Sequence, residues 1–554
     1  MSGRFTVGDY LLARLAGIGI GHVFGVPGDY NLAFLDHVLD SEQLTWVGNA
    51  NELNAAYAAD GYARVQGAGA LLTSYGVGEL SAINGIAGAY AEYVPVIHVV
   101  GAPATSWQRA GAPVHHTFGD GDYRHFARAY AEVTVAQAYL SAGNATAEID
   151  RVLATSLRER RPGYLVLPVD VAAGPAEPPA GPLAIPPPDS SPRVLEDFTA
   201  AARSMLSGTG SLAVLADFLA GRFGVQRELA DLVRAGQIPH ATLSMGKGVF
   251  DESSPDFAGT YSGAGSAKPA QAAVEGADVL ISAGVRFIDA TTSGFSQHID
   301  PERTIDVQPF ATRIGGREFA PLPIRDAVRA LTTVVGQAGR SWARPDLTEE
   351  PDAGPHAPAE LRHAPAGLRQ AQVWPAVQRF LRPGDIVAAE TGTALFGAQE
   401  MRLPAGVTFI CQPQWASIGY TLPAVLGAQL AAPGRRAILL IGDGAAQLTA
   451  QEIGTLLRED CTPIVVVLNN NGYTIERAFH GPAQCYHDIA RWDWALLPAA
   501  MSGQAVRTAR ASTLAEFTAA LDSFAEPAGL VLLEAILPEM DVPEALSALV
   551  HASR

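Results

Sequence analysis

Short runs of aliphatic and β-branched residues alternate along the chain with stretches in which apolar positions recur at helical spacing. The runs end in glycine, proline or polar residues, and strands alternating with amphipathic helices are typical of parallel sheets with crossover helices. The expected strands are "HVFGVPG", "ALLTSYG", "VPVIHVVGAP", "SLAVLAD", "ADVLISAG", "DIVAAETG", "TFICQ", "AILLIGDG" and "PIVVVLNNNG". The pattern predicts a doubly wound α/β protein.

Two proline-rich stretches interrupt this pattern. Residues 172–192 ("AAGPAEPPAGPLAIPPPDSSP") combine proline with small residues, and residues 341–367 combine proline with charge. Both compositions are typical of linkers. A chain of 554 residues is also too long for one hydrophobic core. We therefore expect three domains, at 1–178, 190–338 and 366–554, of which the first and third could share an architecture.

Composition narrows the classes of protein. A formal net charge of −18 argues against nucleic acid or an anionic membrane surface as a main partner. Three cysteines make neither a disulfide framework nor a zinc cluster, which suits a reducing cytoplasm. The first residues lack a secretory signal, and no apolar run reaches membrane-spanning length. We expect a cytoplasmic protein with no membrane contact.

The stretch "AILLIGDGAAQLTAQEIGTLL" predicts a buried strand, a glycine-rich turn and a helix. Glycines let backbone N–H groups approach an anion at the start of the helix. Asp443 would repel a phosphate unless a cation lay between them, and Mg²⁺ prefers carboxylate and carbonyl oxygens supplemented by phosphate. The next strand ends in Asn469, Asn470 and Asn471, which could supply further oxygens. The alternative is a pair of ordinary Asp-Gly and Asn-Gly turns.

Several motifs, in order along the chain, resemble those of the thiamin-diphosphate-dependent 2-oxo-acid decarboxylase family. They are "FGVPGDYNLAFLD", "NELNAAYAADGYAR", "GVGELSAINGIAG", "HHTFGDG", "ETGTALFG", "QPQWASIGYTLPA", the "GDG" to "NN" spacing and "GYTIERAFHG". The resemblance runs from about residue 5 to 545 and favours the pyruvate and indolepyruvate decarboxylase branch. It implies the thiamin-diphosphate-binding fold, in which two cofactor domains flank a middle domain.

The resemblance also implies the residues that hold the cofactor. Asp443, Asn470 and the carbonyl of Gly472 would bind Mg²⁺. The residues expected to line thiamin diphosphate are Glu52, Thr391, Thr393, Ala416, Ser417, Ile418, Asp443, Gly444, Ala445, Asn470, Gly472, Tyr473, Thr474 and Ile475. Ala416 stands where relatives usually carry glycine, and alanine fits there if the backbone has a negative φ.

Glu52 opens the alanine-rich helix "NELNAAYAADGYAR". A glutamate in the first turn of a helix is often there only for the helix dipole. The resemblance instead implies that it hydrogen-bonds the pyrimidine nitrogen of the cofactor and favours its imino tautomer, which needs a buried carboxyl group. Ile418 matches the apolar wedge that bends the cofactor.

His115 and His116 are adjacent in the loop "GAPVHHTFGDGD". Neighbouring side chains point in different directions, so the pair is a poor metal motif, and on its own it reads as a solvated loop. The resemblance implies acid/base catalysis by His115, His116, Asp29 and Glu476. Histidine suits proton transfer near neutral pH.

The substrate pocket, by resemblance, is lined by Ala290, Leu395, Ile475 and Phe479. Pyruvate-specific relatives carry large aromatic side chains at the first two positions. We therefore expect non-oxidative decarboxylation of an aromatic 2-oxo acid such as indolepyruvate or phenylpyruvate, or of a branched-chain one, to an aldehyde and CO₂. Pyruvate decarboxylation and acyloin-forming carboligation are the alternatives. A homodimer or homotetramer with active sites shared between chains is implied too, whereas a non-catalytic regulatory subunit is disfavoured because the acid/base residues are intact.

Overall fold

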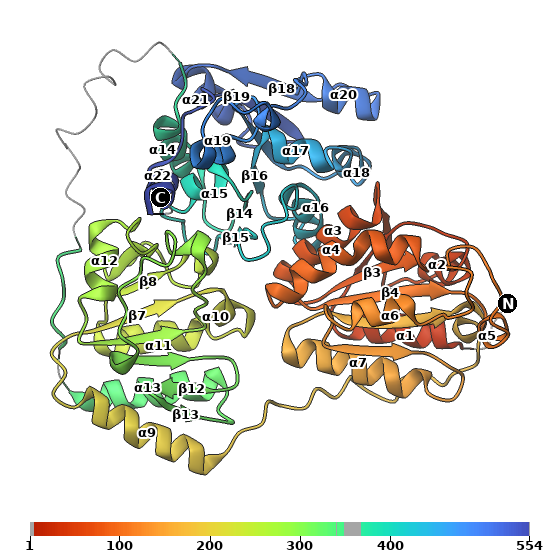
Figure 1. Ribbon diagram of the computed structural model, residues 1–554, viewed down its shortest axis with the longest axis horizontal. Coiled ribbons are helices and arrows are strands. Elements are labelled where there is room, and N and C mark those ends of the chain that lie inside the picture. The colour runs from red at the N-terminus through yellow and green to blue at the C-terminus, as the bar shows by residue number, and fades with distance from the viewer. Residues whose placement is uncertain (1–4, 340, 348–366, 553–554) are drawn as a thin grey trace.

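The computed structural model describes residues 5–339, 341–347 and 367–552. Within them the chain forms three α/β units, each built on its own sheet. In Figure 1 the third unit (cyan to blue) lies above the other two, and the first (red to orange) and second (yellow to green) lie side by side below it. The predicted fold class, three α/β domains built on parallel sheets, is confirmed.

The first sheet is entirely parallel and has the strand order β2-β1-β3-β4-β6-β5. Its strands are β1 (His22–Gly25), β2 (Thr45–Gly48), β3 (Gly69–Ser74), β4 (Val96–Ala102), β5 (Ala136–Tyr139) and β6 (Gly163–Pro168). The helices of this unit are α1 (Val7–Gly17), α2 (Leu32–Leu39), α3 (Glu52–Gln66), α4 (Val77–Ala91), α5 (Thr105–Arg109), α6 (His125–Tyr130), α7 (Ala145–Glu159) and α8 (Val169–Ala172). The strand order reverses between β1 and β3.

The third sheet repeats this order as β15-β14-β16-β17-β19-β18, again with all strands parallel. Its strands are β14 (Ile386–Ala389), β15 (Thr408–Ile410), β16 (Ala437–Gly442), β17 (Ile464–Asn469), β18 (Arg507–Ala511) and β19 (Val531–Ile536). Its helices are α14 (Gln370–Phe380), α15 (Thr393–Ala398), α16 (Thr421–Ala431), α17 (Asp443–Thr449), α18 (Glu452–Arg458), α19 (Thr474–His480), α20 (Leu497–Ser502), α21 (Leu514–Ser523) and α22 (Glu544–Ala552). The expected common architecture of the first and third blocks is confirmed.

The middle sheet has the order β13-β12-β11-β10-β7-β8-β9 and is mixed. Its strands are β7 (Leu212–Ala216), β8 (His240–Thr242), β9 (Phe257–Thr260), β10 (Val279–Ala283), β11 (Thr304–Val307), β12 (Thr312–Ile314) and β13 (Arg317–Phe319), and its helices are α9 (Pro192–Leu206), α10 (Phe218–Arg222), α11 (Gln226–Gly236), α12 (Lys268–Glu275) and α13 (Ile324–Ala338). β12 and β13 are antiparallel, so the expectation of a purely parallel sheet is wrong at this edge. The two-residue Gly315-Gly316 turn allows the hairpin.

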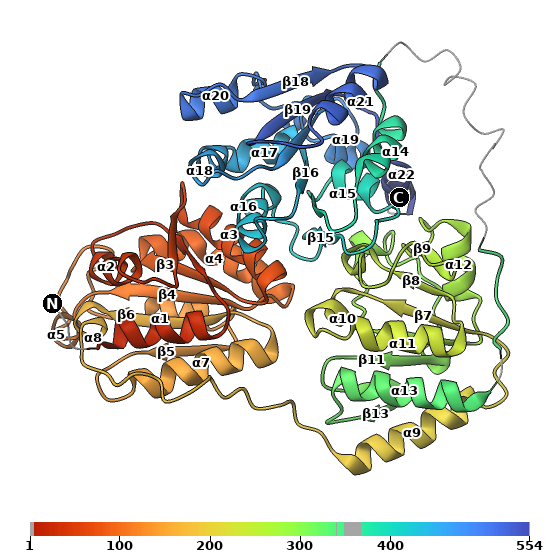
Figure 2. The same ribbon diagram turned by 180° about the vertical axis from the view of Figure 1, so that it is seen from behind.

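The first expected linker runs without helix or regular strand from residue 173 to 191 and crosses from the first unit to the second in Figure 2. Most of the second, residues 348–366, lies outside the described residues. Among the helices of the described segments, none is both long enough and apolar enough to cross a bilayer.

Helices α3 and α16 join the first and third units, as both ribbon views show. The two backbones approach each other at two glycines. A Cβ atom on Gly61 would lie 2.0 Å from the carbonyl oxygen of Ala424, and one on Gly427 would lie 1.8 Å from that of Ala58. Glycine is required at both positions for this approach. The contact fixes α3, which begins with Glu52, against the helix that follows the predicted wedge loop.

Candidate active site

Both outer sheets reverse their strand order between two neighbouring strands, β1 and β3 in the first and β14 and β16 in the third. The carboxyl ends of strands at such a reversal form the usual ligand crevice of an open parallel sheet. Asp29 follows β1, Thr391 follows β14, and Asp443 follows β16. The predicted site residues therefore gather at two equivalent places in the fold.

Asp443, Asn470 and Gly472 lie together at the crevice of the third sheet. One terminal atom of the Asn470 amide lies 3.1 Å from Oδ1 of Asp443 and 2.9 Å from the carbonyl oxygen of Gly472. With nitrogen at that position the amide donates to both oxygens; with oxygen there, three oxygens face one another. Adjacent oxygen ligands of an octahedral Mg²⁺, each about 2.1 Å from the metal, are about 3.0 Å apart. The three groups thus fit a small divalent cation.

The carboxylate of Asp443 is buried, and burial raises its pKa to about 6. The backbone N–H of Gly444 donates to Oδ1 at 2.9 Å and that of Gly472 donates to Oδ2 at 3.1 Å. These bonds hold the carboxylate in one orientation and favour its charged form. A cation would add to that effect.

Gly472 adopts φ +130° and cannot be replaced without strain, because a Cβ atom there would lie 2.2 Å from the carbonyl oxygen of His487. The buried Arg477 fixes the same turn, since its guanidinium donates to the carbonyl oxygens of Asn470 at 3.1 Å and Asn471 at 2.8 Å. Sequence reasoning did not single out Arg477. The orientation of the Gly472 carbonyl therefore depends on a side chain from α19.

The other residues predicted to line the cofactor lie around this crevice. Thr391 and Thr393 lie at the start of α15, Ala416, Ser417 and Ile418 in the loop before α16, Gly444 and Ala445 in α17, and Tyr473, Thr474 and Ile475 at the start of α19. A Cβ atom on Gly444 would lie 2.7 Å from the ring of Tyr473, so glycine is needed there. The starts of α15, α17 and α19 thus border the crevice, and the backbone N–H groups of helix starts favour an anion.

Glu390 is a further buried residue at this crevice. Its carboxylate accepts from the backbone N–H of Thr391 at 3.0 Å and from the N–H and hydroxyl of Thr421 at 3.0 Å and 2.7 Å. Burial raises its pKa to about 7. Glu390 thereby ties the turn after β14 to the start of α16. Its position directly after an apolar strand is the signal in the sequence that could have identified it.

Ala416 has φ +55°, in the left-handed region, so the negative φ at which alanine fits without strain is not adopted. The backbone N–H of Ala416 donates to the carbonyl of Gln412 at 2.8 Å, and the side chains on either side of it bond to the first unit. The side chains that flank Ala416 thus tie the loop to the first unit. An L-residue pays about 1–2 kcal/mol for it.

Asp29, His115 and His116 meet at the crevice of the first sheet. Nε2 of His115 lies 2.7 Å from Oδ2 of Asp29, and the ring of Tyr30 stacks on His115 with centroids 4.9 Å apart. Ligand atoms of the two histidines and Asp29 lie within 4.8 Å of one another. Two of the three are solvent-exposed, and His115 and Asp29 already bond to each other. The arrangement suits the transfer of a proton between the imidazole and the carboxylate.

The loop that carries the histidines is held in a strained conformation. His116 adopts φ +62°, and a Cβ atom on Gly76 would lie 2.1 Å from the carbonyl oxygen of His116. Nδ1 of His116 is buried and has no hydrogen-bond partner in the part of the chain that the structure describes. A buried nitrogen without a partner costs free energy unless a ligand or water satisfies it.

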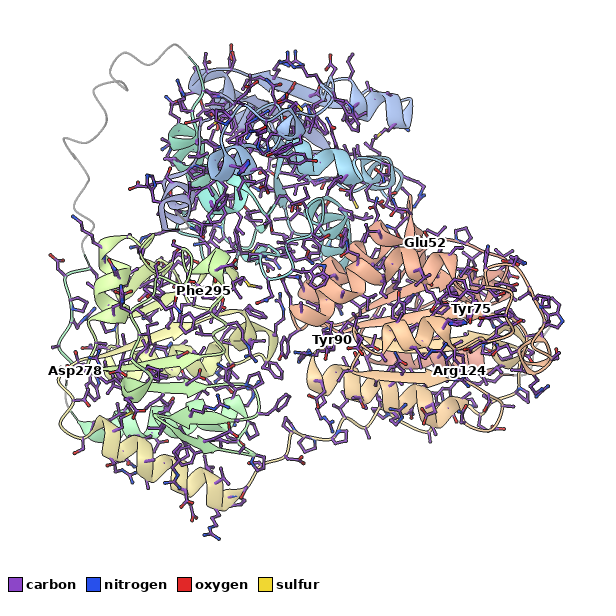
Figure 3. The ribbon with its side chains drawn as sticks, viewed as in Figure 1. Glu52, Tyr75, Tyr90, Arg124, Asp278 and Phe295 are labelled. Atoms are coloured by element: carbon purple, nitrogen blue, oxygen red, sulfur yellow. The ribbon has the colours of Figure 1, made fainter. Side chains whose placement is uncertain are left out.

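Glu52 is the first residue of α3, whose N-cap Asn51 accepts from the N–H of Asn54 at 2.9 Å. The side chain of Glu52 is half-buried against the first turn of α4, where a Cβ atom on Gly78 would lie 3.2 Å from its Oε1. Figure 3 shows Glu52 on the side of the first unit that faces the third. The predicted position at the start of a helix is confirmed, and its catalytic role stays a prediction.

Within the described part of one chain, the predicted site residues of the first unit make no direct polar contact with those of the third. Over the described residues, no hydrogen bond or ion pair joins Asp29, Glu52, His115 or His116 to Asp443, Asn470 or Glu476. Other side chains of the first unit bond to the third, among them Asn49 and Asn54, which both donate to the carboxylate of Glu452. Glu476 is exposed on α19.

The residues predicted to shape the substrate pocket come from two units. Ala290 lies in a short 3₁₀ helix (Asp289–Thr291) of the middle unit and is partly buried, and Phe479 is exposed on α19. Leu395 is buried in the core beneath the third sheet. Its neighbour Phe396, which sequence reasoning missed, packs with Ile475 and α22 in a separate cluster. This cluster places the C-terminal helix against the predicted pocket wall.

Comparison with known proteins identifies the family. Residues 5–150 match the model described as thiamine pyrophosphate enzyme, N-terminal TPP binding domain, residues 199–334 match the central domain, and residues 390–535 match the C-terminal TPP binding domain. A protein named alpha-keto-acid decarboxylase from Mycobacterium ulcerans (strain Agy99) is 49% identical over 547 residues, which cover 99% of this chain and 96% of that protein. One of the same name from Mycobacterium tuberculosis (strain ATCC 25618 / H37Rv) is 50% identical, over 99% of this chain and 97% of that protein.

Proposed function

This chain is a thiamin-diphosphate-dependent 2-oxo-acid decarboxylase of the thiamine pyrophosphate enzyme family, and we propose that it acts non-oxidatively on aromatic or branched-chain 2-oxo acids with the help of Mg²⁺. The products are an aldehyde and CO₂. We place it in the cytoplasm, a proposal that the three unpaired cysteines support.

Thiamin diphosphate, when bound, supplies the carbon nucleophile and the electron sink that loss of CO₂ from a 2-oxo acid requires. The chain supplies its anchors. Asp443, Asn470 and the carbonyl of Gly472 would hold Mg²⁺, which in turn would neutralise the diphosphate. The Asn470 amide atom lies 3.1 Å from Oδ1 of Asp443 and 2.9 Å from the carbonyl oxygen of Gly472, close to the spacing of metal ligands, which supports this assignment. Glu52 would bond the pyrimidine ring, and its partial burial against α4 supports that role.

The observation that carries the proposed reaction is the pairing of His115 with Asp29 at the crevice of the first sheet. After CO₂ leaves, a proton must be delivered to carbon, and another must be taken from the product hydroxyl. His115 can hold a proton at Nε2 with Asp29 as its partner, while His116 presents a second imidazole beside it. Glu476 would complete this group from the third unit.

We further propose that the enzyme is a homodimer or homotetramer whose active sites are each built from two chains. Among the described residues, no hydrogen bond or ion pair joins the two residue groups within one chain, which supports this arrangement. Large apolar side chains are exposed on both the first and the third unit: Val77 of α4 is 55% exposed and Leu448 of α17 is 50% exposed. Contact between chains would cover them and bring Glu52 of one chain to Asp443 of the other.

The preference for large substrates rests on Ala290. An alanine at this position leaves room that an aromatic side chain would fill in a pyruvate-specific enzyme. Leu395 is packed into the core and therefore offers little surface to the pocket. Phe396 and Ile475, which pack against α22, are the better candidates for the opposite wall.

A substrate panel tests the proposal. With thiamin diphosphate and Mg²⁺, we expect phenylpyruvate, indolepyruvate and branched-chain 2-oxo acids to give a kcat/KM about tenfold or more higher than that of pyruvate. Burial of one to two additional methylene groups in an apolar pocket changes kcat/KM by about that factor. Ala290→Tyr should reverse this order, because the ring would fill the space that the larger side chain needs. An unchanged ratio of kcat/KM values would contradict the assignment of Ala290. Acyloin as the main product with an added aldehyde would favour carboligation instead.

A further inference from the structure

The loop Gln412–Gly419 lies between β15 and α16 and carries Ile418, the predicted wedge beneath the cofactor. Its backbone is held in a conformation that alanine disfavours, because Ala416 has φ +55°. A strained residue keeps such a conformation only where its surroundings determine it. The contacts around Ala416 therefore show which part of the molecule controls the wedge.

Asn84, in the middle of α4, contacts the residues on both sides of Ala416. Its Nδ2 donates to the hydroxyl of Ser417 at 2.9 Å, and its Oδ1 accepts from Nε1 of Trp415 at 2.9 Å. Nε1 of an indole can only donate, so this bond fixes which end of the amide faces which partner. Tyr57 completes the group, since its hydroxyl lies 2.6 Å from that of Ser417 and 3.1 Å from Nδ2 of Asn84.

The same face of α4 makes further contacts with the loop. A Cβ atom on Gly88 would lie 2.8 Å from Nε2 of Gln412 and 2.9 Å from Cδ1 of Trp415, so glycine is needed for the indole to lie against the helix. Glu92 accepts from the backbone N–H of Gln414 at 3.1 Å. Asn84, Gly88 and Glu92 are four residues apart and share one face of the helix.

We propose that Asn84 is a positioning residue for the cofactor site: its amide holds Trp415 and Ser417 so that Ala416 stays left-handed and Ile418 keeps its place as the wedge. The proposal rests on the proposed function, because it assumes that thiamin diphosphate lies on this loop. Through Asn84, the first unit positions the cofactor loop in the third unit of the same chain. That role is separate from the one of Glu52, which would act in the partner's site.

The test measures thiamin diphosphate binding to the apoprotein by isothermal titration calorimetry with Mg²⁺ in excess. Asn84→Ala should raise the dissociation constant about tenfold, because the loop is then free to leave the left-handed conformation. Ala416→Gly should change it less than about twofold in the wild type, where the loop is already held. In the Asn84→Ala background, Ala416→Gly should lower the dissociation constant of thiamin diphosphate about fivefold, because glycine adopts positive φ without cost. Thr333→Ala, at an exposed position of α13 in the middle unit where the hydroxyl donates to the carbonyl of Arg329 one turn earlier, is the control and should bind as the wild type does.

The outcome that would overturn the proposal is an Ala416→Gly effect of equal size in both backgrounds, or an Asn84→Ala protein that binds as tightly as the wild type. A purely structural role for Asn84 would lower the melting temperature without this non-additivity. If Asn84→Ala fails to fold, Trp415→Phe removes the indole bond and keeps the ring, and the same rescue is expected. A wild type that does not bind thiamin diphosphate at all would overturn the proposed function itself, whereas binding without decarboxylation would leave the role of Asn84 standing.

Discussion

The carboxylate of Asp443 is buried at the end of β16 beside two other oxygens, and its pKa is raised to about 6 because burial disfavours its charge. Without a cation, the Asn470 amide can turn its nitrogen toward Asp443 and Gly472. With one, the oxygen must face them. Cation binding and the protonation of Asp443 therefore compete for the same carboxylate.

This competition predicts a pH dependence for Mg²⁺. Protonated Asp443 is not a ligand, so lowering the pH from 7 to 5, through the pKa of about 6, should weaken Mg²⁺ binding about tenfold. The measurement is a Mg²⁺ titration at each pH with thiamin diphosphate fixed. Asp443→Asn serves as the control for protonation of the diphosphate, and it should bind weakly and lose the part of the pH dependence that Asp443 contributes. Identical pH profiles in the two proteins would mean that Asp443 is not a ligand.

At the scale of elements, the contact of α3 with α16 sets how the first and third units are placed. α3 begins at Glu52 and α16 follows the wedge loop, so a change in their separation moves both predicted parts of the cofactor site. The close approach depends on Gly61 and Gly427, because any side chain there would meet the backbone of the other helix.

Gly427→Ala should therefore disturb both stability and binding. Its Cβ atom would lie 1.8 Å from the carbonyl oxygen of Ala58, so the helices must separate, at a cost of about 1–3 kcal/mol or more. We expect the thermal midpoint to fall by several degrees and thiamin diphosphate binding to weaken. Gly336→Ala in α13 is the matched control: a Cβ atom there meets nothing within 4 Å, and alanine should leave the midpoint unchanged or raise it. An equal effect of both substitutions would show that helix separation is not the cause.

At the scale of the whole molecule, the proposed shared active site has a direct test in mixed dimers. A dimer of one Glu52→Gln chain and one Asp443→Asn chain would contain one site with both defects and one site with neither. We expect each variant alone to be nearly inactive, and the mixed dimer, purified through two different tags, to have about half the wild-type activity.

The control for this test uses two defects in the same unit. A mixed dimer of Glu52→Gln and His116→Ala chains should stay inactive, because each site receives one damaged first unit. Activity of the first mixture no higher than that of the second would place each complete site within one chain.

Much of the fold follows from patterns that are local in sequence. Apolar runs alternating with amphipathic helices predict the parallel sheets, and a common architecture of the first and third units was expected. The hairpin β12–β13 was missed although "RIGGRE" contains a two-glycine turn, because strands of three residues give almost no periodic signal. The meeting of Asp29 with His115, 86 residues apart, was reached through family resemblance and not through pattern.

The sequence by itself determined the α/β class, the strand-end positions of Asp443 and Asn470 and the helix start at Glu52, because strand, turn and helix signals lie within a few residues of one another. Only the tertiary structure decided the left-handed backbone of Ala416, the hydrogen bonds of Asn84 to Trp415 and Ser417, and the burial of Glu390. Asn84 and Ser417 are 333 residues apart, and an asparagine in a helix has many possible partners. Which of them it meets depends on how α4 packs against the third unit. That packing places the indole of Trp415 against Gly88, and the order of residues along the chain does not reveal which side chain will lie against that glycine.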